Sequence, residues 1–227
     1  MNTCPVTPKD ASESTGPGSL IDGLRHESTM WLSGFIGALT GAGGRVLEVG
    51  CGRHFADAAV LAENGLNVFA CDLNLPQAPR DPSISAFVAD ISRPLPVRTS
   101  NIDAVLASLS LHYFPWSTTM AVFDEIHRVL RPGGVVVFRV NATDDFEHGA
   151  GVGEEVEPGY FVTEVDGGAQ RKHFFDEAAL RKLLARRFTI QHLRHTTTYR
   201  FGTTKRVWEC VAISEIVDET STSSSAR

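Results

Sequence analysis

The chain has 227 residues, of which 42% are hydrophobic and 21% charged, as is typical of a globular protein with a substantial core. Its formal net charge of −6 argues against a nucleic-acid partner, because phosphate binding requires a basic surface. No apolar run approaches the roughly 20 residues of a membrane-spanning helix, so no membrane partner is expected.

The two ends of the chain differ in composition from its centre. Residues 1–19 are rich in Ser, Thr, Pro and Gly, as is the tail 218–227, and both are expected to be mobile around one domain at 20–217. The N-terminus has no apolar stretch typical of a secretory signal. The four cysteines form no CxxC pair, which indicates neither a metal site nor a disulfide framework. A reduced, cytoplasmic setting is therefore expected, and the sequence indicates no particular oligomeric state.

Short, nearly continuous apolar runs recur along the first two thirds of the chain. Strands buried on both faces have this character and belong to parallel sheets. The predicted strands are Arg45–Val49, Asn67–Cys71, Ile84–Ala89, Ile102–Ala107 and Val135–Val140.

Helical patterns separate several of these runs. Leu24–Leu39 is a predicted leading helix, and Ala56–Asn64 is a second one that stops at a glycine. A third helix is capped by Ser117 and ends at Pro132-Gly133-Gly134. Glu177–Arg187 carries a leucine stripe at helical spacing and predicts a fourth.

The last third of the chain begins with an irregular segment. Asn141–Lys172 is Gly-rich, acidic and without periodicity, so a long, functional loop is expected at the ligand-binding edge of the sheet. Phe188–Arg194 and Lys205–Ile213 follow as two strands that pair antiparallel through Thr196–Thr204. The predicted fold is an α/β, Rossmann-like doubly wound sheet, mostly parallel, with one antiparallel strand near the C-terminus.

A strand that runs into a glycine turn is the first functional signal. In the stretch RVLEVGCG, Gly50 and Gly52 allow a sharp bend and a close approach to a ligand. Glu48 places a carboxylate at the strand end, which suits a cationic ligand and repels a pyrophosphate. Binding of NAD requires G-x-G-x-x-G, but Phe55 stands at the third glycine position.

Two further acids follow the next two strands. Asp72 is placed to accept hydrogen bonds from ribose hydroxyls, and Asp90 from an adenine amino group, with Ile91 packing on the ring. Either aspartate alone is also typical of a turn or cap residue. Together with Glu48 they make three acids at the ends of three successive strands, and this arrangement favours a nucleoside-containing ligand.

These segments resemble the successive motifs of class I S-adenosylmethionine (SAM)-dependent methyltransferases. The resemblance rests on VLEVGCG, CDL, VADIS, LASLSLHYF and RVLRPGG and covers roughly residues 24–213. It implies SAM as cofactor and a set of SAM contacts. These are Glu48, Gly50, Cys51, Gly52, Asp72, Leu73, Asp90, Ile91 and Ser108. The departure from the family pattern is Arg53-His54-Phe55, where many members have a third glycine.

A finer resemblance concerns the acceptor. The sequences LSLHYF, RVNATD and KHFF are similar to those of bacterial small-molecule methyltransferases of the tellurite-resistance and thiopurine type. This resemblance implies a small-molecule substrate.

The candidate catalytic residues follow the fourth and fifth strands. His112 is the candidate general base, since histidine titrates near neutral pH; the alternative is that it only lines the pocket wall. Asn141 is a candidate for orienting a polar acceptor, and the alternative is a turn residue that leaves the strand. Two other functions remain open: a non-catalytic SAM-binding or regulatory protein, and an NAD-linked Rossmann oxidoreductase.

Overall fold

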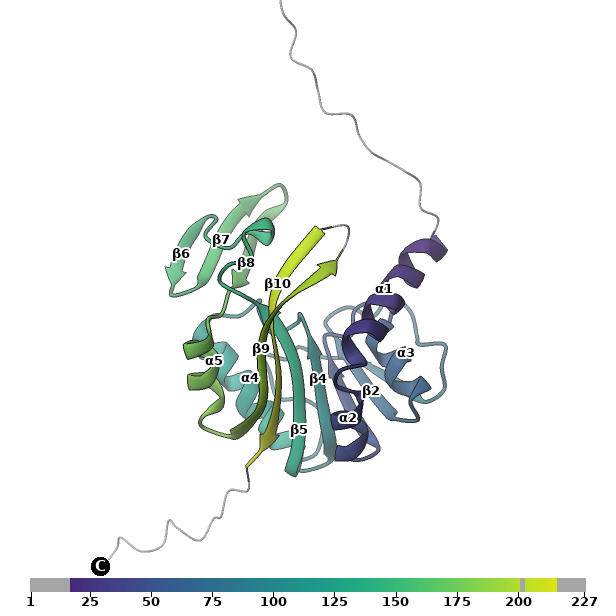
Figure 1. Cartoon of the computed structure of the whole chain (residues 1–227). Helices are drawn as coiled ribbons and strands as arrows, with labels where there is room; N and C mark the ends of the chain where they lie inside the picture. The colour runs from purple at the N-terminus through teal and green to yellow at the C-terminus, as the bar shows by residue number, and fades with distance from the viewer. Residues whose placement is uncertain (1–16, 201–202, 216–227) are drawn as a thin grey trace, which may run out of the picture.

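The computed structural model describes residues 17–200 and 203–215, which form a seven-stranded sheet, a smaller three-stranded sheet and five α-helices (Figure 1). The helices are α1 (Pro17–Leu32), α2 (Ile36–Ala42), α3 (Ala56–Glu63), α4 (Trp116–Val129) and α5 (Glu177–Leu184). The strands of the large sheet are β1 (Arg45–Val49), β2 (Asn67–Asp72), β3 (Ile84–Val88), β4 (Ile102–Ser108), β5 (Leu130–Asn141), β9 (Phe188–Arg200) and β10 (Thr203–Ser214).

The large sheet has the order β3-β2-β1-β4-β5-β10-β9. The first five strands pair in parallel, and β10 inserts antiparallel between β5 and β9. This confirms the predicted Rossmann-like sheet with one reversed strand and a C-terminal hairpin. Because β1 and β4 are central neighbours, the segments that follow them meet at one edge of the sheet, where open α/β sheets bind ligands.

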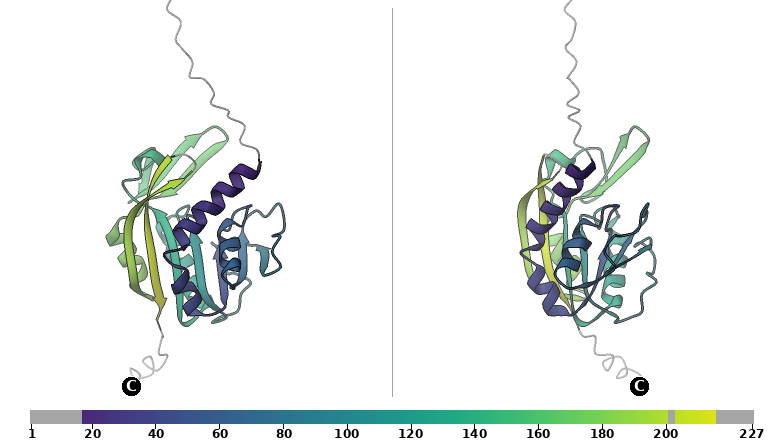
Figure 2. Two further views of the ribbon diagram at one scale, coloured as in Figure 1. Left: turned by 45° about the vertical axis from the view of Figure 1, so that its right-hand side comes forward. Right: turned by 90° about the vertical axis from the view of Figure 1, so that its right-hand side faces the viewer.

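Helices cover both faces of the large sheet. α1, α2 and α3 lie on one face, with α1 and α3 side by side, and α4 and α5 lie on the other (Figures 1 and 2). Two apolar cores result, one on each face: Leu39 and Leu61 belong to the first, and Phe123 and Leu184 to the second. No helix of residues 17–200 or 203–215 is long and apolar enough to cross a bilayer.

The predicted leading helix is wrong as a single element. The chain turns at Ser33–Phe35, where the amides of Gly34 and Phe35 donate to carbonyls three residues back, and the helix restarts as α2. α1 already begins at Pro17, before the predicted domain boundary at residue 20. Residues 1–16 and the predicted mobile tail 218–227 lie outside the described residues.

The segment after β5 is not the irregular loop that was expected. It contains a 3₁₀ turn (Phe146–His148) and the antiparallel sheet β6 (Glu154–Glu157), β7 (Tyr160–Val165) and β8 (Gly168–His173). We call residues 142–176 the cap, because this sheet extends beyond the carboxyl edge of the large sheet (Figures 1 and 2). Tight turns at Gly159 and Gly167, both with positive φ, reverse the chain between its strands.

Candidate functional site

The glycine turn after β1 is shaped by its neighbours. The amides of Gly50 and Cys51 donate to the Cys71 carbonyl at 2.7 and 3.1 Å, which ties the turn to β2. Gly50 has φ +73°, and a Cβ atom there would lie 2.3 Å from that of Ser110, so a side chain has no room. Gly52 also has positive φ, but a Cβ there would meet nothing within 4 Å. The turn is therefore closed toward the protein at Gly50 and open at Gly52.

Phe55 stands at the position where the G-x-G-x-x-G pattern has its third glycine. Its backbone adopts the left-handed conformation, with φ 51°, immediately before α3 begins. That conformation costs a residue with a side chain about 1–2 kcal/mol. The Phe55 ring is buried in the core of this face, which offsets the cost. A buried side chain thus occupies a left-handed backbone position that favours glycine.

A cavity of about 190 Å³ opens beside this turn, lined by β1, α1, α3 and the ends of β4 and β5. Five predicted cofactor residues line it: Glu48, Gly50, Cys51, Gly52 and Ser108. Glu27, Asp57 and Arg139 also contribute to its wall. Asp72, Leu73, Asp90 and Ile91 are not among its lining residues; they lie at or after the ends of β2 and β3, to one side of β1 in the sheet.

Glu48 is the most unusual group in this cavity. Its side chain is 2% exposed, and its Oε2 atom accepts no hydrogen bond from the described residues. Burial raises the pKa of the Glu48 carboxyl well above its ordinary value, and the charges of Asp57 and Asp72 raise it further. A buried carboxyl with an unused acceptor needs a donor, and a cationic donor would favour its charged form.

Cys51 does not act as a nucleophile in this setting. Burial raises the pKa of its thiol, and the nearby carboxylates of Glu48 and Asp72 raise it further. Because the thiolate is the reactive form of cysteine, the protonated thiol is inert. Cys51 therefore serves as a small residue of the turn.

Asp72 and Leu73 extend the site beyond the cavity. Asp72 accepts the Gly52 amide at 2.9 Å through Oδ2 and the Asn74 amide at 3.2 Å through Oδ1, which fixes its carboxylate beside the glycine turn. Leu73 is 67% exposed, an unusual position for a large apolar side chain. A charged acceptor therefore sits next to an uncovered apolar surface.

Asp90 makes the contacts of a turn residue. Its Oδ1 accepts the amide and the hydroxyl of Ser92 at 2.9 and 2.6 Å, and these bonds hold the pKa of Asp90 below its ordinary value. Arg93 adds an exposed ion pair at 3.4 Å. The backbone joins this turn to β2, because the Ala89 amide donates to the Asp72 carbonyl. The role of Asp90 toward adenine stays a prediction.

Arg139 is a site residue that sequence reasoning missed. It is fully buried in β5, donates to Ser108 Oγ at 2.8 Å and to Glu27 Oε1 at 2.9 Å, and lies 4.4 Å from the centre of the Trp31 ring. Trp31 in turn donates to Asp57 at 3.2 Å. α1 is thus fixed over the cavity by buried polar contacts. The only signal in the sequence was a lone arginine inside an apolar run.

The two predicted catalytic residues lie on either side of the segment that ends the cap. His112 is buried, its ring contacts that of Tyr113, and its carbonyl accepts the amide of His173 at 2.7 Å. Asn141 is 0% exposed, and its carbonyl accepts the Phe175 amide at 2.9 Å. Neither atom of the Asn141 side-chain amide bonds to the described residues. The cap therefore covers both residues, and neither of them lines the Glu48 cavity.

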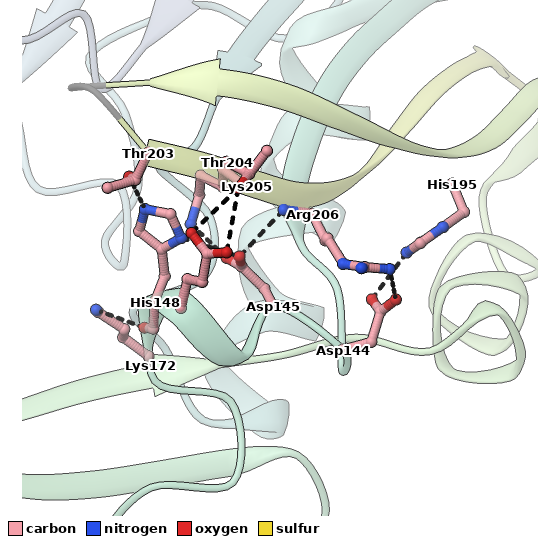
Figure 3. Close-up of polar contacts among 10 residues, drawn as sticks. Asp144, Asp145, His148, Lys172, His195, Thr203, Thr204, Lys205 and Arg206 are labelled. Carbon is pink, nitrogen blue, oxygen red and sulfur yellow. Dashed lines mark hydrogen bonds and ion pairs between the residues drawn. The ribbon is translucent and has the colours of Figure 1, made fainter.

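A polar cluster anchors the cap to β10 (Figure 3). Asp145 is 1% exposed and accepts Lys205 Nζ at 2.7 Å, the Arg206 amide at 3.0 Å and His148 Nδ1 at 2.9 Å. On the other side of the ring, His148 Nε2 lies 3.1 Å from Thr203 Oγ1. A buried aspartate thus joins the start of the cap to the C-terminal hairpin.

Part of the sequence matches known methyltransferases. Residues 47–138 match the family model described as a methyltransferase domain. The malonyl-[acyl-carrier protein] O-methyltransferase of Enterobacter lignolyticus is 31% identical over 109 residues, which is 44% of this chain and 40% of that protein. The chain spans less than half the length of the curated relatives it matches.

Solved structures share the fold at low sequence identity. A SAM-dependent methyltransferase from Methanosarcina mazei superposes with a TM-score of 0.63 at 19% identity, covering 76% of this chain and 92% of that one. A 1,6-didemethyltoxoflavin-N1-methyltransferase from Burkholderia thailandensis gives 0.60 at 20% identity, covering 88% and 85%. These likenesses establish the fold.

Proposed function

We propose that this chain, which contains a methyltransferase domain of the class I type, transfers a methyl group from SAM to a small-molecule acceptor. The observation that carries the proposal is the buried Glu48 carboxyl, which has an unused acceptor atom in the same cavity as the open side of the glycine turn. The resemblance to tellurite-resistance and thiopurine enzymes stays a prediction within this proposal.

The residues present fit this cofactor. Glu48 would accept the ammonium group of the methionine part, and Gly52 would leave room for the ligand to approach the backbone. Asp72 would accept the ribose hydroxyls, while the exposed side chain of Leu73 would cover one face of the adenine. The remaining predicted contacts are Gly50 and Cys51 in the glycine turn, Asp90 and Ile91 at the adenine edge, and Ser108 on the β4 side.

The chain's own groups then have a limited catalytic task. When bound, SAM supplies a methyl group on a sulfonium, which is a good leaving group. Alignment of the acceptor and exclusion of water therefore account for much of the rate. His112 would take the proton that the acceptor loses, and Asn141, whose buried amide lacks partners among the described residues, would orient a polar acceptor.

The first prediction tests the cofactor. We expect calorimetry to show binding of S-adenosylhomocysteine and none of NAD, because Glu48 would repel a pyrophosphate. Asp72→Ala should weaken S-adenosylhomocysteine binding roughly ten- to a hundredfold, since it removes hydrogen bonds to a charged acceptor.

The matched control is Asp81→Ala. Asp81 lies on the connection that follows Asp72 and, among the described residues, its side chain bonds only within its own turn, to Ser83, so its loss should leave the affinity unchanged. Binding of NAD without any response to S-adenosylhomocysteine would instead support the NAD-linked oxidoreductase.

The second prediction concerns the proton on Glu48. Burial raises the pKa of the unliganded Glu48 carboxyl and so shifts it toward its protonated form, whereas an ammonium ligand favours the charged carboxylate. Binding of S-adenosylhomocysteine should therefore release protons at pH values below the raised pKa, and the affinity should rise with pH until that pKa is passed. Calorimetry in buffers of different ionisation enthalpy measures the released proton. Glu48→Gln should bind more weakly and release none; proton-neutral binding in the wild type contradicts the assignment.

A further inference from the structure

A second, larger cavity lies under the cap and is separate from the Glu48 cavity. Its volume is about 610 Å³, within the range typical of small-molecule sites. Its walls come from the cap sheet on one side and from α4 and α5 on the other, and it shares no lining residue with the Glu48 cavity. The cap in Figure 1 extends over the ends of α4 and α5 that form this wall.

Four aromatic residues line this cavity from two sides. Trp116 comes from α4, and Phe146, Phe161 and Phe174 come from the cap. Phe161 and Phe174 meet edge to face at 6.0 Å, while Phe146 is 71% exposed at the start of the cap. Rings from both sides favour a flat, apolar ligand between them.

Carboxylates dominate the charge around the cavity. Glu155, Glu157 and Asp176 line it against a single ammonium, that of Lys182, which lies 5.6 Å from the centre of the Trp116 ring. His173 adds no positive charge, because burial lowers the pKa of its ring. The cavity therefore complements a cation.

The carboxylates are oriented by backbone donors. Glu157 Oε1 accepts the amide of Trp116, and Glu155 Oε1 accepts the amide of Gly159 at 2.8 Å. The Oε2 atoms of Glu155 and Glu157 accept no hydrogen bond from residues 17–200 or 203–215. These two oxygens are left to bind the donors of a ligand.

The cavity is lined by residues that neighbour the predicted catalytic residues, although neither His112 nor Asn141 lines it. Its lining includes Thr143, two residues after Asn141, and His173, whose amide donates to the carbonyl of His112. A ligand held here would lie against the segments that carry both residues.

We propose that this cavity binds the methyl acceptor, and that the acceptor is a small organic amine with a flat, apolar body. The aromatic rings hold the body, and Glu155 and Glu157 hold the ammonium group as an anchor. This assignment of the acceptor class rests on the proposed function, whereas the binding of an amine by the cavity can be measured without methyl transfer.

The test uses a matched pair of probes on the full chain, tryptamine and indole-3-propionate, each titrated with and without saturating S-adenosylhomocysteine. Tryptamine should bind roughly tenfold or more tightly than the acid. Glu157→Gln should weaken tryptamine binding by a similar factor, because the glutamine still accepts the Trp116 amide but loses the charge. The affinity for S-adenosylhomocysteine should stay unchanged.

Two variants separate charge recognition from damage to the fold. Lys182→Met removes the competing ammonium, so it should tighten tryptamine binding, whereas a damaged cavity would weaken it. Glu164→Gln, on an exposed part of β7 that does not line the cavity, should change neither probe.

The outcomes distinguish the two proposals. S-adenosylhomocysteine binding with no tryptamine binding, equal binding of amine and acid, or tryptamine binding that is indifferent to Glu157→Gln would each overturn the amine site. Tryptamine binding that responds to Glu157→Gln, in a chain that ignores S-adenosylhomocysteine, would keep the amine site and overturn the methyltransferase proposal.

Discussion

Asp145→Ala is expected to lower the free energy of unfolding by about 3–5 kcal/mol, because it breaks a buried ion pair on one side only. The variant deprives the buried ammonium of Lys205 of the carboxylate it contacts at 2.7 Å. It also removes the acceptor of the Arg206 amide and the partner of His148 (Figure 3). Urea unfolding followed by circular dichroism measures the change.

The neighbouring residue provides the matched control. Asp144 pairs with Arg206 at 3.0 Å and with His195 at 2.8 Å, but these groups are substantially exposed. Asp144→Ala should therefore cost about 1 kcal/mol or less. The double variant Asp145→Leu with Lys205→Met, which buries neither charge, should be more stable than Asp145→Ala. Equal losses in the two single aspartate variants would mean that the buried cluster does not hold the cap.

The central strands of the large sheet were predictable because they are buried on both faces. β1 and β4 therefore read as nearly continuous apolar runs, and their ends carry candidate site residues. The break between α1 and α2 was not predictable in this way. The apolar spacing continues through Ser33–Phe35, and only the local hydrogen bonds, which change to tighter turns there, interrupt the helix.

The cap was missed because its strands have no continuous buried face. β6 is the acidic sequence Glu154–Glu157 and is mostly exposed, so it lacks the alternation that predicts a half-buried strand. The cap is joined to β10 by a contact that is distant in sequence, the pairing of Asp145 with Lys205, 60 residues further on. Local sequence patterns do not carry such information.

The candidate cofactor site also contains residues that the sequence could place and residues that it could not. The positions of Glu48, the glycine turn and Asp72 in the candidate site were predictable because each lies at or directly after the end of a strand. Arg139 was not, because its partner Glu27 lies 112 residues away and its charge stands inside an apolar run. The cavity under the cap was also hidden, since its walls join α4, α5 and a sheet that the sequence did not predict.

The last prediction concerns His112. If it is the general base, His112→Gln should lower turnover by roughly a hundredfold or more and leave S-adenosylhomocysteine affinity nearly intact. The wild-type rate should also fall as the medium is acidified, because a protonated imidazole cannot accept a proton. The acceptor for this assay can be found by screening small amines and cell extracts for SAM-dependent products that are heavier by one methylene group.

The alternative for His112, a residue that only shapes the wall, gives a different pattern. His112→Gln would then raise the Michaelis constant for the acceptor, while the turnover number and its pH profile would stay close to those of the wild type. His127→Gln is the matched control, since that histidine lies on α4 and bonds to the Glu215 carbonyl, away from both cavities. A fully active His112→Gln enzyme with a pH-independent rate would assign catalysis to alignment and desolvation. Absence of turnover with every acceptor, despite tight S-adenosylhomocysteine binding, would point instead to a non-catalytic SAM-binding protein.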